Sequence, residues 1–346
     1  KGVMIPFRAL GVNLNLAATI AEPQMNCTSE VVALLPSAHM YGLMFEFLFE
    51  MTIGAHVHFL TRLPSPKVIL NAFSEIRPDV IIAVPLIIEK VYKSKLKPIL
   101  EKNDIKYLLK VPLLNQIILK KIRNGMIEAF GGRFEEVILG GAAFNPEVER
   151  FLKRVNFPFT IGYGMTECAP LISFSLYGED KPGTCGKVLE GYMEAKIDHP
   201  NAEGVGEVLV RGEHVMQGYY KNAEATKAAF TKDGWLRTGD LGIIDEEGYL
   251  SIKGRNKTML LGPSGQNIYP EEIEAKLDNM PYVMESLVIQ HHDQLVALVC
   301  PDYESADQNK LDADKLEEAM EANRKALNAL LPAYEQINKV KLYPHE

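Results

Sequence analysis

The segment from Tyr163 to Glu167 brings three chemically useful side chains together within five residues. It supplies an aromatic ring, the hydroxyl of Thr166 and a carboxylate, arranged around Gly164, and it follows the apolar run Phe157–Ile161. Such a run predicts a strand, and a strand can deliver all three groups to one mouth. A stacking face, a hydroxyl and a carboxylate in one place suit a nucleotide and its metal ion.

Three further segments carry groups of the same kind. The sequence Gly-Gly-Ala-Ala at 140–143 follows a predicted strand, and its small residues permit a flat base to approach the backbone. The carboxylate of Asp240, in Thr-Gly-Asp, can hold two vicinal hydroxyls, as a ribose offers. The guanidinium of Arg255, in Gly254–Lys257, suits phosphate oxygens. Each segment alone also fits an ordinary turn or helix start, so the interpretation depends on their combination.

Four segments resemble, in their order and spacing, the motifs of the adenylate-forming (AMP-binding) enzymes, in particular the long-chain fatty-acyl-CoA ligases. These segments are Ile161–Glu167, Thr238–Asp240, Gly254–Lys257 and Gly265–Glu272. The resemblance covers nearly all of the chain. It implies an acid–thiol ligase that uses ATP and Mg²⁺ to activate a fatty acid as acyl-AMP and then transfers the acyl group to coenzyme A. This reaction joins two anions and makes an intermediate that water hydrolyses, so it needs metal and donor groups and a water-excluding site.

The resemblance also assigns roles in the nucleotide site. It implies that Thr166 contacts the phosphate in catalysis and that Glu167 binds Mg²⁺. It implies that Asp240 accepts hydrogen bonds from the ribose and that Arg255 binds ribose and phosphate. Lys257, also counted as catalytic, is expected to be the hinge between a large and a small domain. The adenine is expected to lie against Gly141, Ala142, Ala143, Tyr163 and Gly164.

His39 stands in the apolar segment Leu35–Gly42. By resemblance it shapes the acyl pocket and acts in catalysis, whereas a lone histidine among apolar residues is as often structural. The following run Leu43–Phe49 is expected to form a core helix, and it could also wall an acyl tunnel. The sequence of this region resembles that of fatty-acid-activating enzymes. It lacks the Asp that amino-acid-activating relatives use to hold the substrate amine.

The order of predicted elements indicates two fold types. Short apolar runs such as Val80–Val84 and Glu136–Gly140 predict strands, and Ser65-Pro66 and Asn145-Pro146 predict the starts of helices. This alternation over residues 1–170 predicts the α/β part of a large domain with a mostly parallel sheet, expected to be incomplete. Glycine-separated alternating runs over 171–256 predict a β-rich, barrel-like subdomain. Residues 257–346 predict a mobile, truncated α+β C-terminal domain.

Composition narrows the function classes. The chain has 346 residues and a net charge of -8, which argues against nucleic acid as the main partner. No apolar run reaches the length of a membrane span, and the four cysteines have no metal-ligand or disulfide spacing. We expect a cytoplasmic protein. Two alternatives stay open at this point: peripheral membrane contact for substrate supply, and a homodimer.

The two ends affect the expected activity. The chain begins at Lys1-Gly2, which resembles the last residues of the family's phosphate loop, so Lys1 is expected to be the loop lysine. It stops at Glu346, before the segment in which the family places a catalytic lysine. We therefore expect both ends to be cuts through a longer enzyme and the chain alone to be nearly inactive. The alternatives are an acyl-carrier-protein synthetase and a non-catalytic scaffold that binds nucleotide or acyl-adenylate.

Overall fold

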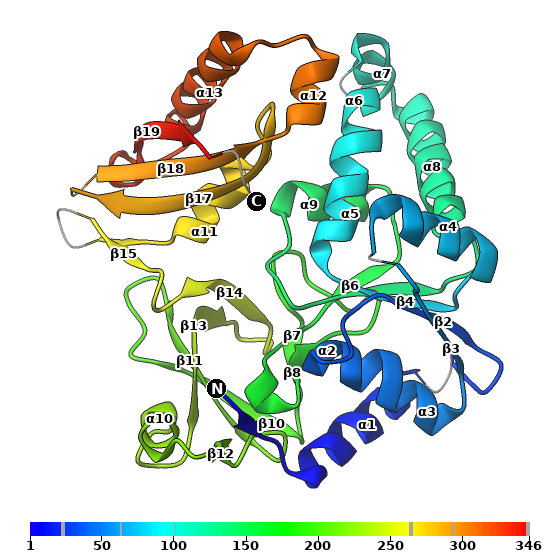
Figure 1. Ribbon diagram of the computed structural model, residues 1–346, viewed down its shortest axis with the longest axis vertical. Helices are drawn as coiled ribbons and strands as arrows, with labels where there is room; N and C mark the ends of the chain where they lie inside the picture. Colours follow the sequence, from blue (N-terminus) through cyan, green and yellow to red (C-terminus); the bar gives the residue numbers. More distant parts are fainter. Residues whose placement is uncertain (22–24, 63, 101, 263–265, 293, 344–346) are drawn as a thin grey trace. The chain divides into compact units, whose positions relative to one another are not determined.

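The computed structural model describes the chain except residues 22–24, 63, 101, 263–265, 293 and 344–346 (Figure 1). The described chain divides into two compact units. The first unit comprises Lys1–Asp198, Val208–Thr238 and Ile243–Ile252. The second comprises His199–Glu207, Gly239–Gly242 and Lys253–Glu346. The boundaries placed after residues 170 and 256 from the sequence stay predictions.

Parallel strands form the centre of the first unit, as the alternating pattern predicted. Strand β2 pairs with β3, and β5 lies between β4 and β6, all in parallel register. The backbone N–H of Asp79 donates to the carbonyl of Glu30 at 2.9 Å, which ties the starts of β2 and β4 together. The bounds are Glu30–Ala33 (β2), His56–Phe59 (β3), Val80–Ala83 (β4), Glu136–Leu139 (β5) and Phe159–Ile161 (β6).

Helices alternate with these strands. The sequence predicted α4 and α9, whose starts are capped by the side chains of Ser65 and Asn145, each followed by a proline in the first turn. The helices of this region are Phe7–Ala21 (α1), Met40–Leu43 (α2), Phe49–Ile53 (α3), Pro66–Ile76 (α4), Pro85–Val91 (α5), Lys97–Leu100 (α6), Asn103–Leu108 (α7), Pro112–Ala129 (α8) and Pro146–Arg154 (α9), with π-helical turns at Met44–Leu48 and Tyr92–Leu96.

The main core of the first unit lies between the strands and these helices. Phe73 of α4 and Phe130, which follows α8, are fully buried with ring centroids 5.7 Å apart. Leu139 of β5, Leu152 of α9 and Phe159 of β6 complete the centre of the cluster. Each such side chain stabilises the fold by about 1.5–3 kcal/mol through burial, so this core fixes the strand ends that carry the site.

The β-rich part of the chain contains separate sheets. The predicted barrel is not found among the described residues, because strands β10, β11, β13 and β14 form a sheet in that order whose two ends do not pair. Four strands are too few for closure, which takes about five to eight. The strands are Val3–Met4 (β1), Tyr163–Gly164 (β7), Leu171–Phe174 (β8), Lys187–Val188 (β9), Met193–Asp198 (β10), Gly206–Gly212 (β11), Gly218–Tyr219 (β12), Leu236–Ile244 (β13) and Leu250–Arg255 (β14), with one helix at Ala223–Ala229 (α10).

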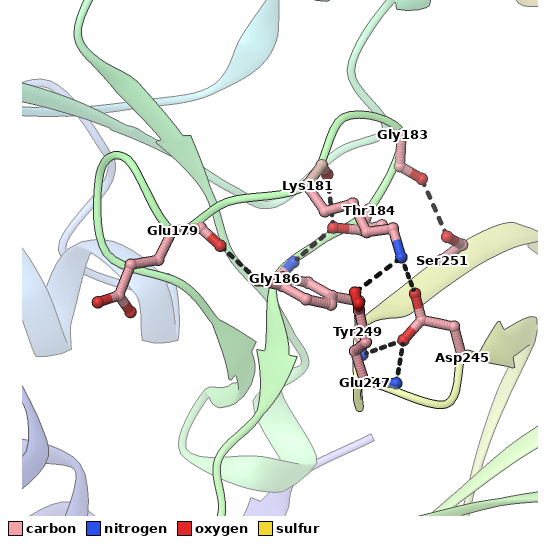
Figure 2. Close-up of polar contacts among 9 residues, drawn as sticks. All are labelled: Glu179, Lys181, Gly183, Thr184, Gly186, Asp245, Glu247, Tyr249 and Ser251. Carbon is pink, nitrogen blue, oxygen red and sulfur yellow. Dashed lines mark hydrogen bonds and ion pairs between the residues drawn. The ribbon is translucent and has the colours of Figure 1, made fainter.

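A polar network fastens the segment before β9 to the turn between β13 and β14, as Figure 2 shows. The ammonium of Lys181 lies 2.7 Å from an Asp245 carboxylate oxygen and 3.0 Å from one of Glu247. The hydroxyl of Tyr249 donates to the carbonyl of Glu179 at 2.5 Å. Exposed ion pairs contribute little stability individually, so the network mainly fixes where this segment lies.

Gly186 allows two backbone segments of this region to approach closely. Its φ is +83°, and a Cβ there would lie 2.3 Å from the carbonyl carbon of Phe174 and 2.5 Å from the nitrogen of Ser175. The backbone N–H of Leu250 donates to the carbonyl of Gly186 at 2.9 Å. Glycine is therefore required both for the backbone conformation and for space, and the contact holds the end of β8 in place.

The second unit contains an α+β arrangement with its own core. Strand β18 pairs with β17 in antiparallel and with β19 in parallel register. Helices α11 and α13 bury Ile273 and Leu327 together with Ala297 of β18. That residues 257–346 move as a domain stays a prediction. The elements are Leu260–Leu261 (β15), Asn267–Ile268 (β16), Pro270–Leu277 (α11), Val283–His291 (β17), Gln294–Pro301 (β18), Tyr303–Gln308 (α12), Ala313–Asn328 (α13) and Ile337–Leu342 (β19).

The close approach at Gly186 leads to a first prediction. Gly186→Ala should lower the free energy of unfolding by at least about 2 kcal/mol more than Gly191→Ala, as measured by chemical denaturation. Gly191 is the matched control, because its φ is +82° and a Cβ there meets nothing within 4 Å. The difference therefore isolates the clash from the backbone strain. Equal losses in the two variants would show that the contact with Phe174 and Ser175 is unimportant.

Candidate nucleotide and acyl site

A tight turn presents the Tyr163–Glu167 segment. Tyr163 pairs with Ser173 across β7 and β8, and the backbone N–H of Met165 donates to the carbonyl of Pro170 at 2.8 Å. A Cβ on Gly164 would lie only 2.2 Å from that carbonyl oxygen. A side chain at this position would open the turn, so the glycine is required for close approach rather than for a left-handed backbone.

The carboxylate of Glu167 is held by a neighbour that the sequence analysis did not identify. The Tyr219 hydroxyl, on β12, donates to Glu167 Oε1 at 2.8 Å. Burial, and then the hydrogen bond to this carboxylate, raise the pKa of Tyr219 to about 12. The Lys1 ammonium lies 4.7 Å from the centre of the Tyr219 ring. The neutral side chain of Tyr219 thus contacts both the Lys1 ammonium and the Glu167 carboxylate.

The Gly-Gly turn after β5 contacts Tyr41, a second residue that the sequence analysis did not assign to the site. The Tyr41 hydroxyl donates to the carbonyl of Ile138 at 3.2 Å, and its ring would lie about 3.2 Å from a Cβ on Gly140. Gly141 has a φ of +85° and lines the cavity described below. Ala142 and Ala143 are exposed, and neither lines that cavity in the described part of the chain. The turn is therefore shaped by Tyr41 packing against it.

These segments surround one cavity of about 110 Å³ within the first unit. Five of the predicted site residues line it: His39, Gly141, Tyr163, Gly164 and Thr166. Most of the remaining wall is apolar and comes from α1, the α2–α3 stretch and the strands. A mostly apolar lining with a few polar groups can hold a ligand that has a polar and an apolar part. The apolar wall includes Met25, Phe45, Phe49, Ile82, Ile138 and Phe174.

His39 lies at the start of the helical stretch that walls the cavity. Its Nδ1 accepts a hydrogen bond from the backbone N–H of Tyr41 at 3.3 Å, so it caps α2, and its side chain is exposed. The predicted core helix over Leu43–Phe49 is present, with a π-helical turn at Met44–Leu48. A histidine with both a capping contact and access to the cavity fits the structural and the functional alternative alike.

Two carboxyl groups are buried beside this wall. Glu46 accepts from the backbone N–H groups of Leu34 and Leu35 at 2.9 and 2.8 Å, which ties the helical stretch to the end of β2. Burial raises its pKa to about 7. Glu50 lines the cavity, and neither of its carboxylate oxygens has a hydrogen-bond partner among the described residues. Burial, and then the charge of Glu46, raise the pKa of Glu50 to about 8.

The remaining three predicted residues belong to the second unit. Asp240 is buried on β13, and Arg255 Nε lies 3.2 Å from its Oδ1. The Arg255 side chain is 72% exposed, so most of the guanidinium is accessible to another ligand. Lys257 is exposed in the turn that follows β14. The backbone N–H of Asn256 donates to the carbonyl of Gly239 at 2.8 Å, which holds the Asp240 and Arg255 segments together.

The carboxylate of Glu167 is the predicted magnesium ligand. Within the described residues, no group of three or more His, Cys, Asp or Glu side chains could hold a metal ion. A single carboxylate still fits Mg²⁺, which is usually bound through one or two carboxylates plus substrate phosphates and water. The hydroxyl of Tyr219 orients Glu167 through one oxygen, so its other oxygen can face a metal ion.

Comparison with known proteins decides the family. A sequence model of the AMP-binding enzyme family matches residues 1–220. The chain belongs to this family. The family expected from the four sequence segments is therefore confirmed, and the match includes every predicted site residue of the first unit.

Several curated relatives of the chain are named long-chain-fatty-acid–CoA ligases. It is 28% identical over 296 residues to long-chain-fatty-acid–CoA ligase ACSBG2 of Gallus gallus, covering 78% of this chain and 38% of the relative. It is 31% identical over 299 residues to long-chain-fatty-acid–CoA ligase 4 of Saccharomyces cerevisiae, covering 79% of this chain and 42% of the relative. The chain therefore spans about two fifths of the length of these family members.

Solved structures of other family members share the fold. ATP-bound MatB from Rhodopseudomonas palustris matches all of this chain, and 62% of its own chain is covered, with 25% identity and a TM-score of 0.74. The Bacillus subtilis o-succinylbenzoate CoA synthetase in complex with an acyl-adenylate intermediate has a TM-score of 0.73 and 23% identity, covering 100% of this chain and 63% of that one. The chain thus has the mixed α/β fold of adenylate-forming enzymes.

The buried carboxyl of Glu50 leads to a second prediction. Its folded-state pKa of about 8 exceeds the ordinary value of 4.5, so the folded state binds more protons between these values. The free energy of unfolding should fall as pH rises through this window, by on the order of 2–4 kcal/mol. Glu50→Gln does not titrate, so it should lose the part of this dependence that comes from Glu50 and keep the part that comes from Glu46, whose pKa is raised to about 7.

The measurement is chemical denaturation at about pH 5.5 and about pH 8.5 for both proteins. Glu75→Gln, on the exposed face of α4, is the matched control and should keep the wild-type pH dependence. An unchanged dependence in Glu50→Gln would contradict the assignment of a buried, neutral carboxyl.

Proposed function

We propose that the protein activates a fatty acid with ATP as acyl-AMP and transfers the acyl group to coenzyme A. The observation that carries this proposal is the cavity of the first unit. Its lining combines the polar side chains of Tyr163 and Thr166 with the apolar side chains of Phe45, Phe49 and Ile82. An acyl-adenylate has this same division between a polar nucleotide and an apolar chain. The relatives named long-chain-fatty-acid–CoA ligases support a long apolar acid as substrate.

Each site residue of the first unit has a separate proposed role in the adenylation step. The ring of Tyr163 offers a stacking face to adenine, and the bare backbone at Gly141 lets the base approach. The Thr166 hydroxyl can donate to phosphate oxygens. Mg²⁺, when bound with ATP, neutralises phosphate charge, and Glu167 is the residue proposed to hold it. Lys1, beside Tyr219, adds a cation to the same side of the site.

The residues of the second unit recognise the sugar. Asp240 is proposed to accept hydrogen bonds from the ribose hydroxyls, since a buried carboxylate can hold two donors at once. Arg255, paired with it at 3.2 Å, is proposed to reach ribose and phosphate oxygens. Lys257, exposed in the following turn, is proposed as the pivot of a mobile small domain.

The competing proposals concern the acceptor and the reaction itself. A carrier-protein thiol in place of coenzyme A would change only the second half-reaction. A non-catalytic scaffold would bind acyl-adenylate and release it unchanged. Both share the nucleotide and acyl site, so binding tests address the site first.

A third prediction concerns the nucleotide end of the site. Tyr163→Ala and Asp240→Asn should each weaken AMP binding by about tenfold or more, because stacking or a charged hydrogen bond contributes about 1–3 kcal/mol. Isothermal titration calorimetry with AMP measures the effect. Tyr177→Ala and Asp314→Asn are the matched controls, as both residues are exposed and lie outside the proposed site. Unchanged affinity in both site variants would show that the nucleotide binds elsewhere.

A fourth prediction concerns the acyl end. Non-hydrolysable acyl-adenylate mimics of increasing tail length should bind with affinities that rise and then level off. Each buried CH₂ should add up to roughly 0.8 kcal/mol until the cavity ends. AMP serves as the tail-free reference. An affinity independent of tail length would remove the apolar cavity from the proposed function, while leaving the nucleotide site intact.

A further inference from the structure

A strongly basic stretch stands out in an otherwise acidic chain. Residues 90–123 contain ten Lys and Arg and two Asp and Glu, a net charge of +8, whereas the whole chain carries -8. The stretch includes α6, α7 and α8, which belong to the first unit (Figure 1). Segregated charge of this size creates a local positive potential that the overall charge conceals. Its exposed lysines are Lys95, Lys102, Lys106, Lys110, Lys120 and Lys121.

Large apolar side chains are exposed on the same helices. Tyr107 of α7 is 71% exposed, Ile117 of α8 is 63% exposed and Ile99 of α6 is 47% exposed. On α8, Leu114, Ile117 and Lys121 follow one another at spacings of three and four, so they share one face. Leu119, Ile122 and Met126 occupy the opposite face and pack on the main core. Because of this spacing, the outward face of α8 carries both apolar and basic residues.

A groove lies between these helices and α9. It has a volume of about 560 Å³ and a floor that includes Leu100, Leu109 and Phe151. Its walls also carry five cations against one carboxylate, that of Glu147. Glu147 accepts from the Tyr92 hydroxyl at 3.1 Å and lies 3.4 Å from the Lys97 ammonium. The cations that line the groove are Lys97, Lys106, Lys110, Arg150 and Arg154.

We propose that the exposed basic surface of α6, α7 and α8, called the basic face, binds an anionic membrane surface. Anionic lipids offer phosphate headgroups to the lysines and an apolar layer to Ile99, Tyr107 and Ile117. An acidic protein partner would match the charge but would leave these apolar side chains without an equally extended apolar layer. The inference does not depend on the reaction catalysed, because it rests on α6, α7 and α8 rather than on the cavity.

The test is cosedimentation of the whole chain with vesicles. Phosphatidylcholine vesicles containing phosphatidylserine should bind the protein, and vesicles of phosphatidylcholine alone should bind it at least about tenfold more weakly. Raising the salt concentration from about 0.1 M to about 0.5 M should release it, because the charges are exposed and screened. Equal binding to both vesicle types would overturn the proposal.

Charge and apolar variants locate the surface. Lys106→Glu with Lys110→Glu should lower the partition coefficient at least about tenfold, since each lysine near an anionic leaflet contributes about fivefold. Ile117→Ser should weaken binding without changing its salt dependence. Lys227→Glu with Lys232→Glu makes the same charge change at exposed positions outside this face and is the matched control. Thermal melts confirm that each variant folds.

Two results would contradict the proposal. The control double variant would lose as much binding as Lys106→Glu with Lys110→Glu, which would indicate a general charge effect. In the second, phosphatidylserine vesicles would bind neither wild type nor Ile117→Ser, whereas poly-glutamate would bind both proteins equally well. This result would indicate an acidic polypeptide partner.

Discussion

The close approach of Gly164 to the carbonyl of Pro170 is the constraint on which the candidate site depends. Without a side chain at 164, the backbone N–H of Met165 reaches that carbonyl at 2.8 Å. The turn that results carries the ring of Tyr163 and the hydroxyl of Thr166 to the same cavity. It also starts the short 3₁₀ helix at Thr166–Cys168, which brings Glu167 within 2.8 Å of the Tyr219 hydroxyl.

Buried polar groups fix the opposite wall of the cavity. Glu46 accepts two backbone hydrogen bonds from the end of β2, so its burial is compensated. Glu50, one helical turn further on, has no such partner among the described residues and is kept neutral by burial. Tyr41 donates to the backbone of β5 and shapes the Gly-Gly turn. The helical wall is thus positioned by hydrogen bonds to the residues that follow β2 and to β5.

Local pattern predicted much of the fold because periodicity and capping act over a few residues. The strands near Val80 and Glu136 and the helices that begin after Ser65 and Asn145 lie where the sequence placed them. The barrel was wrong, because the alternating runs of β10–β14 show that strands form but not whether a sheet closes. Tyr219 was missed for a similar reason, as nothing in its local sequence reveals that it lies beside Glu167.

The sequence by itself determined the family, since the identity, order and spacing of four short segments are properties of the chain alone. It also determined which residue types were available for a nucleotide, at Tyr163, Thr166, Asp240 and Arg255. Only the tertiary structure decided which of them meet. Contacts such as those between Glu167 and Tyr219 join positions 52 residues apart, and they depend on strand pairing and core packing rather than on local preference. The same holds for the basic face, whose charge is visible in the sequence but whose exposure is decided by which side of α8 packs on the core.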